Sequence, residues 1–305
     1  MKTNSYIIEI DDTSSGQRID NFLLRVLKDI PKSHVYKIIR SGEVRVNKKR
    51  IKSLYKLQEN DQVRIPPVTQ KEREEKSPDN RLELNIIHED EWFMVINKPS
   101  GLAVHGGSGI DFGLIEYLRN QRKDLRYLEL VHRLDKNTSG LILIAKKRSS
   151  LRSLQELFRN KQISKFYLVA VQGLWKDKVK DVSSYLKKVN KDDGHHVHEV
   201  KGPEEGKLSR SIFYLESNNE NYSILSVHLI TGRTHQIRVQ LANLGFPILG
   251  DDKYGNFDLN RKLVSSGLKK MFLHSHKLRF HHPFTDNIFE CISPLPNNFE
   301  KLLNE

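Results

Sequence analysis

The apolar residues near the start of the chain are spaced as in helices that pack against a core. Over residues 16–30 they recur at offsets of three, four, seven and eight, on one face of a predicted helix: Ile19, Phe22, Leu23, Val26 and Leu27. Pro31 ends this helix, and Gly42 is suited to end a second one in a left-handed turn. Alternating apolar residues after Gly42 predict short strands. This region should form a small domain of two helices and a few strands.

After Leu82 the pattern changes to short apolar runs separated by turn residues, which is typical of strands. We predict strands at 92–96, 130–134, 141–145, 166–171, 211–215 and 222–230. Ser149 and Thr234 are suited to cap two intervening helices. Because strands dominate and only a few helices interrupt them, we predict an α+β fold, with a mainly antiparallel mixed sheet and flanking helices.

A polar segment separates these two patterns. Pro66 and Pro67 lead into a run that ends at Asn80 and contains one aliphatic residue and no aromatic residue, as expected of a solvated linker. We therefore predict an N-terminal domain over 1–65, a linker over 66–80 and a larger domain over 81–305.

Charge changes this picture by indicating a partner. The 305 residues carry a net charge of +13, and a surplus of Lys and Arg raises affinity for phosphate polymers through counterion release. Residues 32–56 hold nine Lys or Arg and one acidic residue, Glu43. This cluster lies on one small helix-turn-strand unit, which favours RNA binding over a merely solvated face. The candidate contacts are Lys37, Arg40, Lys48, Lys49 and Arg50.

Other features of the composition exclude some classes of protein. No run approaches the roughly 18 apolar residues of a membrane-spanning helix, and the first residues lead into no apolar signal core, so we expect a cytoplasmic protein. The single cysteine, Cys291, excludes an internal disulfide framework and a multi-cysteine zinc site. We expect no cofactor and no membrane partner, and we take a monomer as the default state.

One candidate for chemistry is the carboxylate of Asp135. It follows an apolar run and lies in a polar loop whose Asn, Thr, Ser and Gly residues can form a tight turn through side-chain hydrogen bonds. A loop between two strands holds a reacting group in place and leaves it open to substrate. A plain turn role for Asp135 stays open on this evidence, because the spacing by itself names no reaction.

Longer motifs make the chain resemble known families. The segments RIDNFL, PKSHVYKIIRSGEVRVNKKRI and DQVRI, between Gly16 and Ile65, resemble the S4 domain, a small RNA-binding module. HRLDKNTSG (132–140) resembles the HRLDxxTSG signature of the RluA family of pseudouridine synthases. KFYLVAVQG (165–173), TGRTHQIRVQLANLGFPILGDDKYG (231–255) and FLHSHKLRFHHP (272–283) follow in the family's order. Nearly the whole chain is similar to members that modify 23S rRNA, so the resemblance implies 23S rRNA or a large-subunit assembly intermediate as partner.

The resemblance also implies roles for individual residues. Asp135 would be the catalytic carboxylate, although whether it attacks the sugar or the base, or takes a sugar proton, stays open. Arg238 would pair bidentately with Asp135, and Arg233 is its rival for this role. Tyr167 would stack on the uracil and accept the proton from carbon 5. Arg133 would occupy the place of the uridine extruded from the RNA.

Two other classes of function compete with this interpretation. The chain has thirteen histidines, and a metal-assisted RNA hydrolase would use such residues. However, no HExxH or comparable ligand spacing occurs, and His195, His196 and His198 fall in a segment that we predict to be a polar loop. The second alternative is a ribosome-assembly factor that binds rRNA without catalysis. The joint presence of Asp135, Tyr167 and Arg238 argues against it.

Overall fold

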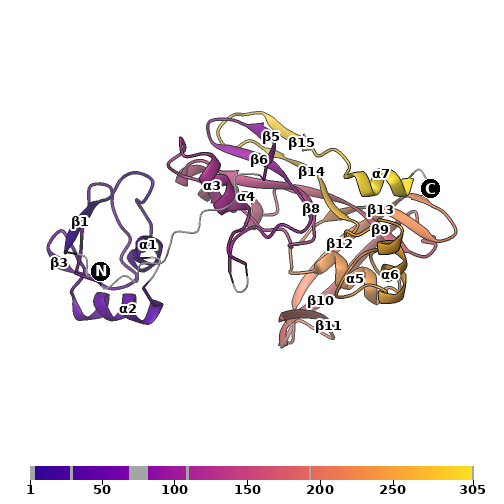
Figure 1. Ribbon diagram of the computed structural model, residues 1–305, viewed down its shortest axis with the longest axis horizontal. Coiled ribbons are helices and arrows are strands. Elements are labelled where there is room, and N and C mark those ends of the chain that lie inside the picture. Colours follow the sequence, from indigo (N-terminus) through magenta and orange to yellow (C-terminus); the bar gives the residue numbers. More distant parts are fainter. Residues whose placement is uncertain (1–3, 28–29, 69–81, 108–109, 192–193, 304–305) are drawn as a thin grey trace. The chain divides into compact units, whose positions relative to one another are not determined.

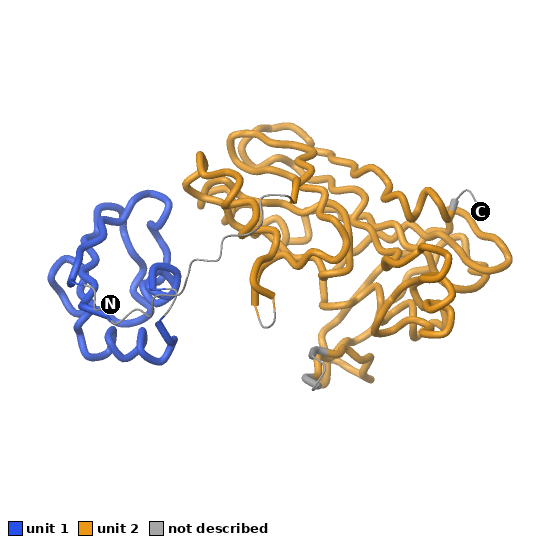
Figure 2. The backbone as a smooth tube through the Cα atoms, in the orientation of Figure 1, with its two compact units in different colours: residues 1–77 blue, residues 78–305 orange. Residues whose placement is uncertain are grey.

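The chain forms two compact units, Met1–Ser77 and Pro78–Glu305, in a computed structural model (Figure 2). The structure describes residues 4–27, 30–68, 82–107, 110–191 and 194–303. The division lies within the predicted linker 66–80, whose residues from 69 onward lie outside these ranges. Within the described ranges, no helix is both long and apolar enough to cross a membrane.

The smaller unit contains two helices and a four-stranded sheet with the strand order β1-β4-β2-β3 (Figure 1). Its elements are β1 (Tyr6–Glu9), α1 (Ile19–Val26), α2 (Lys32–Ser41), β2 (Arg45–Val46), β3 (Lys49–Arg50) and β4 (Gln62–Ile65). Apolar side chains of both helices pack on the sheet and form a core of their own, which includes Phe22, Ile38 and Val63. The predicted two-helix module is therefore confirmed.

The first helix is shorter than the predicted range 16–30. Gly16 and Gln17 exchange backbone hydrogen bonds with Leu57, and the amide of Ile19 donates to the carbonyl of Tyr55. These residues thus pair with a distant segment, and the helix begins only at Ile19. The second helix ends as predicted, because Gly42 adopts a φ of 75°, a left-handed conformation that glycine tolerates without strain.

The larger unit is built on one eleven-stranded sheet. The strand order is β11-β10-β12-β13-β9-β14-β8-β6-β5, with β15 paired to β14 and β7 paired to β8. The strands are β5 (Asn85–Glu89), β6 (Phe93–Lys98), β7 (Glu129–Leu130), β8 (Ser139–Ala145), β9 (Ser164–Gln172), β10 (Val179–Lys191), β11 (Gly194–Val200), β12 (Lys207–Asn218), β13 (Tyr222–Leu229), β14 (Leu273–His281) and β15 (Ile288–Ile292). The helices are α3 (Leu114–Gln121), α4 (Arg148–Arg159), α5 (Gln236–Asn243), α6 (Phe257–Ser265) and α7 (Asn297–Leu303).

Among the described strand pairs of this sheet, β8 and β14 run parallel and the others run antiparallel. The α+β class with a mainly antiparallel mixed sheet is thus confirmed. The centre of the sheet is covered on both faces. Ile142 and Ile144 of β8 face a core with α3, α5 and α7, whereas Leu141 and Leu143 face a second core with α4. This two-sided burial explains the unbroken apolar run 141–145.

The segment predicted as a polar loop around His196 is instead the hairpin of β10 and β11, in which Lys187 pairs with His198 and Val189 with His196. Charged and polar residues are frequent in this hairpin, so its sequence lacks the apolar alternation of a half-buried strand. Two predicted helix caps are also wrong. Lys147 and His235 occupy the cap positions of α4 and α5, in place of Ser149 and Thr234.

We predict that Gly140→Ala destabilises the larger unit by at least about 2 kcal/mol. Gly140 has a φ of 104°, and a Cβ atom there would lie 2.2 Å from the carbonyl oxygen of Ser275, where β8 meets β14. The check is urea unfolding followed by tryptophan fluorescence, since Trp92 and Trp175 both lie in this unit. Gly202→Ala, with open space around the new methyl group, is the control. Equal unfolding midpoints for the two variants would contradict the prediction.

Candidate active site

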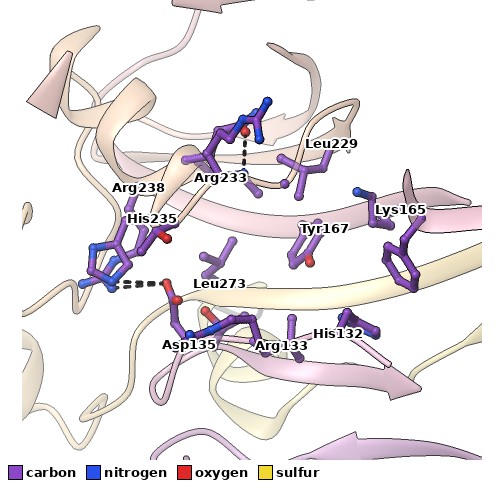
Figure 3. Close-up of a pocket in the computed structure, with 17 residues that line it drawn as sticks. His132, Arg133, Asp135, Lys165, Tyr167, Leu229, Arg233, His235, Arg238 and Leu273 are labelled. Carbon is purple, nitrogen blue, oxygen red and sulfur yellow. Dashed lines mark hydrogen bonds and ion pairs between the residues drawn. The ribbon is translucent and has the colours of Figure 1, made fainter. Parts of the chain in front are cut away.

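A pocket of about 270 Å³ lies in the larger unit where three segments meet the sheet (Figure 3). Residues 132–135 form one wall, and Lys165 and Tyr167 of β9 form a second. The third wall is formed by residues 232–238, which comprise the turn before α5 and the first residues of that helix, and Leu273 of β14 lies between the walls. Three of the predicted site residues that line this pocket, Asp135, Tyr167 and Arg238, come from distant parts of the sequence.

Asp135 lies in the loop between β7 and β8. The strand predicted over 130–134 is wrong beyond Leu130, where β7 ends. Here the imidazole of His132, in place of a backbone carbonyl, accepts a hydrogen bond from the neighbouring strand β8. Its Nε2 atom accepts a hydrogen bond from the amide of Leu143 at 3.1 Å. The chain can then leave the sheet, and the amide of Thr138 donates to the carbonyl of Asp135 at 3.1 Å and closes a turn. Asp135 therefore lies in the loop that follows the early end of β7.

Lys98, the last residue of β6, and Ser100 hold this loop in place through hydrogen bonds. The ammonium group of Lys98, which is fully buried, donates to the carbonyls of Pro99, Leu102 and Lys136 at 2.8–3.1 Å. The hydroxyl of Ser100 donates to the carbonyl of Asn137 at 2.7 Å. Burial lowers the pKa of Lys98 to about 7, while the nearby charge of Asp135 acts in the opposite direction. Lys98 thus ties the loop to β6 and places a cation near the carboxylate.

Arg238 of α5 contacts Asp135, but its main partner is Asp251. Its Nε and Nη2 atoms each lie 2.7 Å from a carboxylate oxygen of Asp251, and its Nη2 atom lies 3.1 Å from Asp252. Only Nη1 reaches Asp135, at 3.4 Å. The expected bidentate pair between Arg238 and Asp135 is therefore wrong, because Asp251 already occupies the two parallel donors.

Both members of the Arg238–Asp251 pair are buried, with side chains 4% and 0% exposed. Burial by itself would raise the pKa of Asp251, but Arg238 and the backbone amides of Lys253 and Tyr254 hold that pKa below its usual value. Asp251 itself raises the pKa of Arg238 against the effect of burial. The rival arginine, Arg233, donates from Nε to the carbonyl of Leu208 and contacts Asp135 nowhere in the described structure.

His235 is the second group beside the carboxylate. Its Nε2 atom lies 3.8 Å from Asp135, and its Nδ1 atom shares a 2.9 Å hydrogen bond with the hydroxyl of Tyr254. Burial lowers the pKa of His235, although Asp135 opposes this effect. The Tyr254 hydroxyl also accepts from the amide of Val197 in β11 at 2.9 Å. A chain of contacts therefore runs from the hairpin β10–β11 to Asp135.

Tyr167 and Arg133 complete the pocket (Figure 3). Tyr167 is 7% exposed, and burial raises its pKa to about 12. Arg133 is exposed at the rim, and its side chain makes no hydrogen bond or ion pair to another described residue. Of the other predicted contacts, Lys37, Arg40, Lys48 and Lys49 are exposed in the smaller unit. Arg50 differs, because its guanidinium donates to the carbonyl of Ser41 at the end of α2.

Several residues of this site were not predicted from the sequence: Lys98, His235, Asp251 and Tyr254. Lys98 could have been found, since a lysine at the end of an apolar strand and before Pro-Ser-Gly is unusual. Asp251 and Tyr254 lie in the segment 231–255 that carries the family resemblance, but nothing in their own type or spacing indicated a role, because polar loops often contain these residues. Among the described residues, no three or more His, Cys, Asp and Glu side chains are grouped so that they could hold a metal ion.

Comparisons with known proteins agree with this arrangement. A family model described as RNA pseudouridylate synthase matches residues 92–243, and one described as the S4 domain matches residues 17–63. The chain is 47% identical over 303 residues to the ribosomal large subunit pseudouridine synthase C of Pasteurella multocida (strain Pm70), covering 97% of this chain and 92% of that one. The protein of the same name from Escherichia coli (strain K12) is 46% identical over 307 residues, covering 98% and 96%.

Two human structures share the fold of the larger unit. The RNA pseudouridylate synthase domain containing 4 structure has a TM-score of 0.57 at 26% identity and covers 72% of this chain and 92% of that one. The structure of RNA pseudouridylate synthase domain containing 1 has a TM-score of 0.59 at 24% identity and covers 72% and 86%. The two family models and the two relatives confirm both resemblances drawn from the sequence motifs.

We predict that His132 makes the protein less stable in acid. Burial, aided by the charge of Lys165, lowers the pKa of His132 to about 3, while an unfolded histidine titrates near 6.5. Between these values the unfolded state binds more protons, so stability falls as pH decreases, by up to about 1.4 kcal/mol per pH unit. A glutamine at this position can accept the Leu143 amide without titrating.

The measurement is urea unfolding between pH 6.5 and pH 4 for wild type, His132→Gln and the exposed-histidine control His281→Gln. The unfolding free energy of His132→Gln should depend less steeply on pH than that of wild type, whereas His281→Gln should keep the wild-type dependence. An unchanged slope in His132→Gln would show that this ring is not held neutral.

Proposed function

This chain belongs to the RNA pseudouridylate synthase family, and we propose that it converts uridines to pseudouridine in the 23S rRNA of the large ribosomal subunit, with Asp135 as the catalytic carboxylate. The observation that carries the proposal is the position of Asp135. Its side chain is 22% exposed, lines the pocket and has a guanidinium 3.4 Å away. The names of the two relatives, which this chain matches over nearly its whole length, support the large subunit as substrate.

The reaction moves a bond within one nucleotide. The bond from N1 of uracil to C1′ of the ribose breaks, the uracil turns, and C5 forms the new bond to C1′. The proton on C5 leaves and N1 gains one, so no oxidant, reductant or second substrate is consumed. The protein therefore has to hold the detached base, stabilise charge and move protons, and the residues of this pocket are of the types that do so.

Asp135 meets the ribose or the base as a carboxylate, and either role uses its negative charge. The guanidinium of Arg238 and the ring of His235 limit where this charge can point, since they lie 3.4 Å and 3.8 Å from the same oxygen, Oδ2. The other oxygen, Oδ1, makes no hydrogen bond to a described residue and is available to substrate. Groups oriented before the substrate arrives need not reorganise during the reaction.

Tyr167 holds the uracil in this proposal. Its hydroxyl keeps its own proton at neutral pH, because burial raises the pKa of Tyr167 to about 12. Its ring can still pack against the base. Acceptance of the C5 proton by this hydroxyl, the role implied by the resemblance, requires that the hydroxyl gives up its own proton in the same step.

A stacked uridine must leave its RNA helix to reach Asp135. We propose that Arg133, which is exposed at the rim of the pocket, fills the space that the uridine leaves. The smaller unit would dock the RNA through Lys37, Arg40, Lys48 and Lys49. The RNA would be free 23S rRNA or an assembly intermediate of the large subunit, bound by a monomer in the cytoplasm, where bacterial ribosomes are assembled.

We expect Asp135→Asn to reduce turnover strongly without unfolding the protein. The amide keeps the shape of the side chain but removes its charge, so the rate should fall by about 100- to 10 000-fold. The assay measures tritium released from a 23S rRNA transcript labelled at C5 of uridine. Asp177→Asn, an exposed carboxylate paired with Lys180 and outside the pocket, is the matched control.

Two outcomes of this assay would count against different parts of the proposal. Wild-type rates in Asp135→Asn would remove Asp135 from the mechanism. No release by the wild-type protein, above the level of Asp135→Asn, would favour the non-catalytic assembly factor.

The docking role of the smaller unit predicts a change in salt dependence. Replacing Lys37, Lys48 and Lys49 with glutamine should reduce the slope of log affinity against log salt by about 0.7 to 0.9 for each phosphate that the variant no longer neutralises. Replacing Lys176, Lys178 and Lys301, which are exposed in the larger unit, gives a charge-matched control. Filter binding to 23S rRNA from 50 to 300 mM salt is the measurement, and equal slopes for both triple variants would rule out this docking surface.

A further inference from the structure

One cation of the pocket has no role in the chemistry described above. Lys165 lies on β9 two residues before Tyr167, and both side chains line the pocket. Figure 3 shows Lys165 and His132 toward one end of the pocket, and Asp135 and His235 toward the other. The ammonium of Lys165 thus stands apart from the carboxylate that acts on the nucleotide.

The surroundings of Lys165 are unusual for a lysine. Its side chain is partly buried, and no carboxylate among the described residues forms an ion pair with it. Its ammonium lies over the ring of Phe158, 5.6 Å from the centroid. Cation–π contact offsets only part of the cost of taking an ammonium out of water. The ammonium of Lys165 therefore loses hydration without gaining an ion-pair partner in the described structure. A cation in this state is suited to bind an anion that arrives with the substrate.

The backbone near Lys165 leaves space for that anion. A Cβ atom built on Gly232 would have Nζ of Lys165 as its nearest neighbour, at 3.7 Å, so the missing side chain of Gly232 keeps one side of the ammonium open. Arg133 and Arg233 line the same pocket, which makes its rim cationic. The neighbouring rings of His132 and His228 are neutral, since burial and the charge of Lys165 both lower their pKa values.

The spacing along β9 identifies the part of the substrate involved. Residues two apart on a strand lie about 6.6 Å apart and face the same side. This separation is on the scale of the distance between a nucleobase and its own phosphate. If Tyr167 packs on the uracil, Lys165 lies where the backbone of the same nucleotide passes.

We propose that Lys165 binds a backbone phosphate next to the extruded uridine and so sets how far the nucleotide enters the pocket. This inference rests on the proposed function, because it takes RNA as the substrate. Lys165 is a positioning residue in this role. A lysine meets phosphate as a point charge with three donors, so it can follow the phosphate as the base turns.

The test compares wild type, Lys165→Met, Lys165→Arg and the control Lys277→Met. Lys277 lies on the neighbouring strand β14, is paired with Glu290 at 3.0 Å and does not line the pocket. Binding to 23S rRNA is measured against salt for the full-length protein carrying Asp135→Asn, and turnover is measured by tritium release in the Asp135 background. Lys165→Met should weaken binding by about 10-fold. It should also reduce the salt slope by about 0.7 to 0.9.

Turnover separates a phosphate contact from a role in the chemistry. Removing an interaction made equally in the bound and transition states raises KM and leaves kcat within a few fold of wild type. Lys165→Arg, which keeps the charge, should restore most of the salt slope, and Lys277→Met should match wild type. Thermal unfolding gives a further check, because removing a partly buried charge that has no ion-pair partner among the described residues should leave Tm unchanged or raise it.

The pH dependence of binding supplies a second signature. Burial lowers the pKa of Lys165 to about 8, so in wild type the affinity should fall between pH 7.5 and pH 9 as the ammonium loses its proton. His132 and His228, the titratable groups beside it, are already neutral in this range. The affinity of Lys165→Met should not show this decrease between pH 7.5 and pH 9.

Several results would overturn the inference. An unchanged salt slope in Lys165→Met would do so, as would a large loss of kcat at an unchanged slope, which would instead place the ammonium on the uracil or in proton transfer. A lowered Tm in both Lys165 variants would assign the residue to folding. If the wild-type protein releases no tritium, the proposed function fails, whereas the salt slopes still decide whether Lys165 contacts RNA.

Discussion

The geometry of the pocket depends on the buried ion pair between Arg238 and Asp251. Such pairs gain little net stability, because both charges lose their hydration, but breaking one leaves an uncompensated charge in the interior. What the pair provides is orientation. With Nε and Nη2 committed to Asp251, the guanidinium has one outward-facing nitrogen, Nη1, and this is the atom that lies near Asp135. The ring of Tyr254, 5.2 Å from the guanidinium carbon, packs against the same group.

The opposite side of Asp135 is held through backbone groups. Lys98 and Ser100 hold the carbonyls of Lys136 and Asn137, so the turn after Asp135 cannot shift without leaving a buried ammonium and a partly buried hydroxyl unpaired. His132 fixes the other end of the loop through Leu143. The carboxylate is therefore immobilised by side chains on both flanks, while its own Oδ1 atom stays unbound. A site with this construction resembles the preorganised charge arrangements that enzymes use.

The sequence predicted those parts that depend on local spacing. Apolar periodicity found the central strands and both small-unit helices, and the motifs led to Asp135, Tyr167 and Arg238, all of which line one pocket. The failures share a cause. Where α1 begins, where the strand before His132 stops and which carboxylate pairs with Arg238 are decided by partners that lie outside the same helix or strand. Leu57, Leu143 and Asp251 supply these partners, and the periodicity within a single element does not reveal them. The hairpin β10–β11 was not predicted, because its frequent polar side chains remove the alternation of apolar residues that indicates a strand.

The place of β14 in the sheet has a consequence for the newly made chain. Tyr167 lies on β9 and Asp135 precedes β8, and β14 separates these two strands in the finished sheet. The strand that sets the width of the pocket is therefore among the last to leave the ribosome during synthesis, more than a hundred residues after the groups it spaces. The basic smaller unit is thus complete in a nascent chain well before the strand that joins Tyr167 and Asp135 in one sheet has been made.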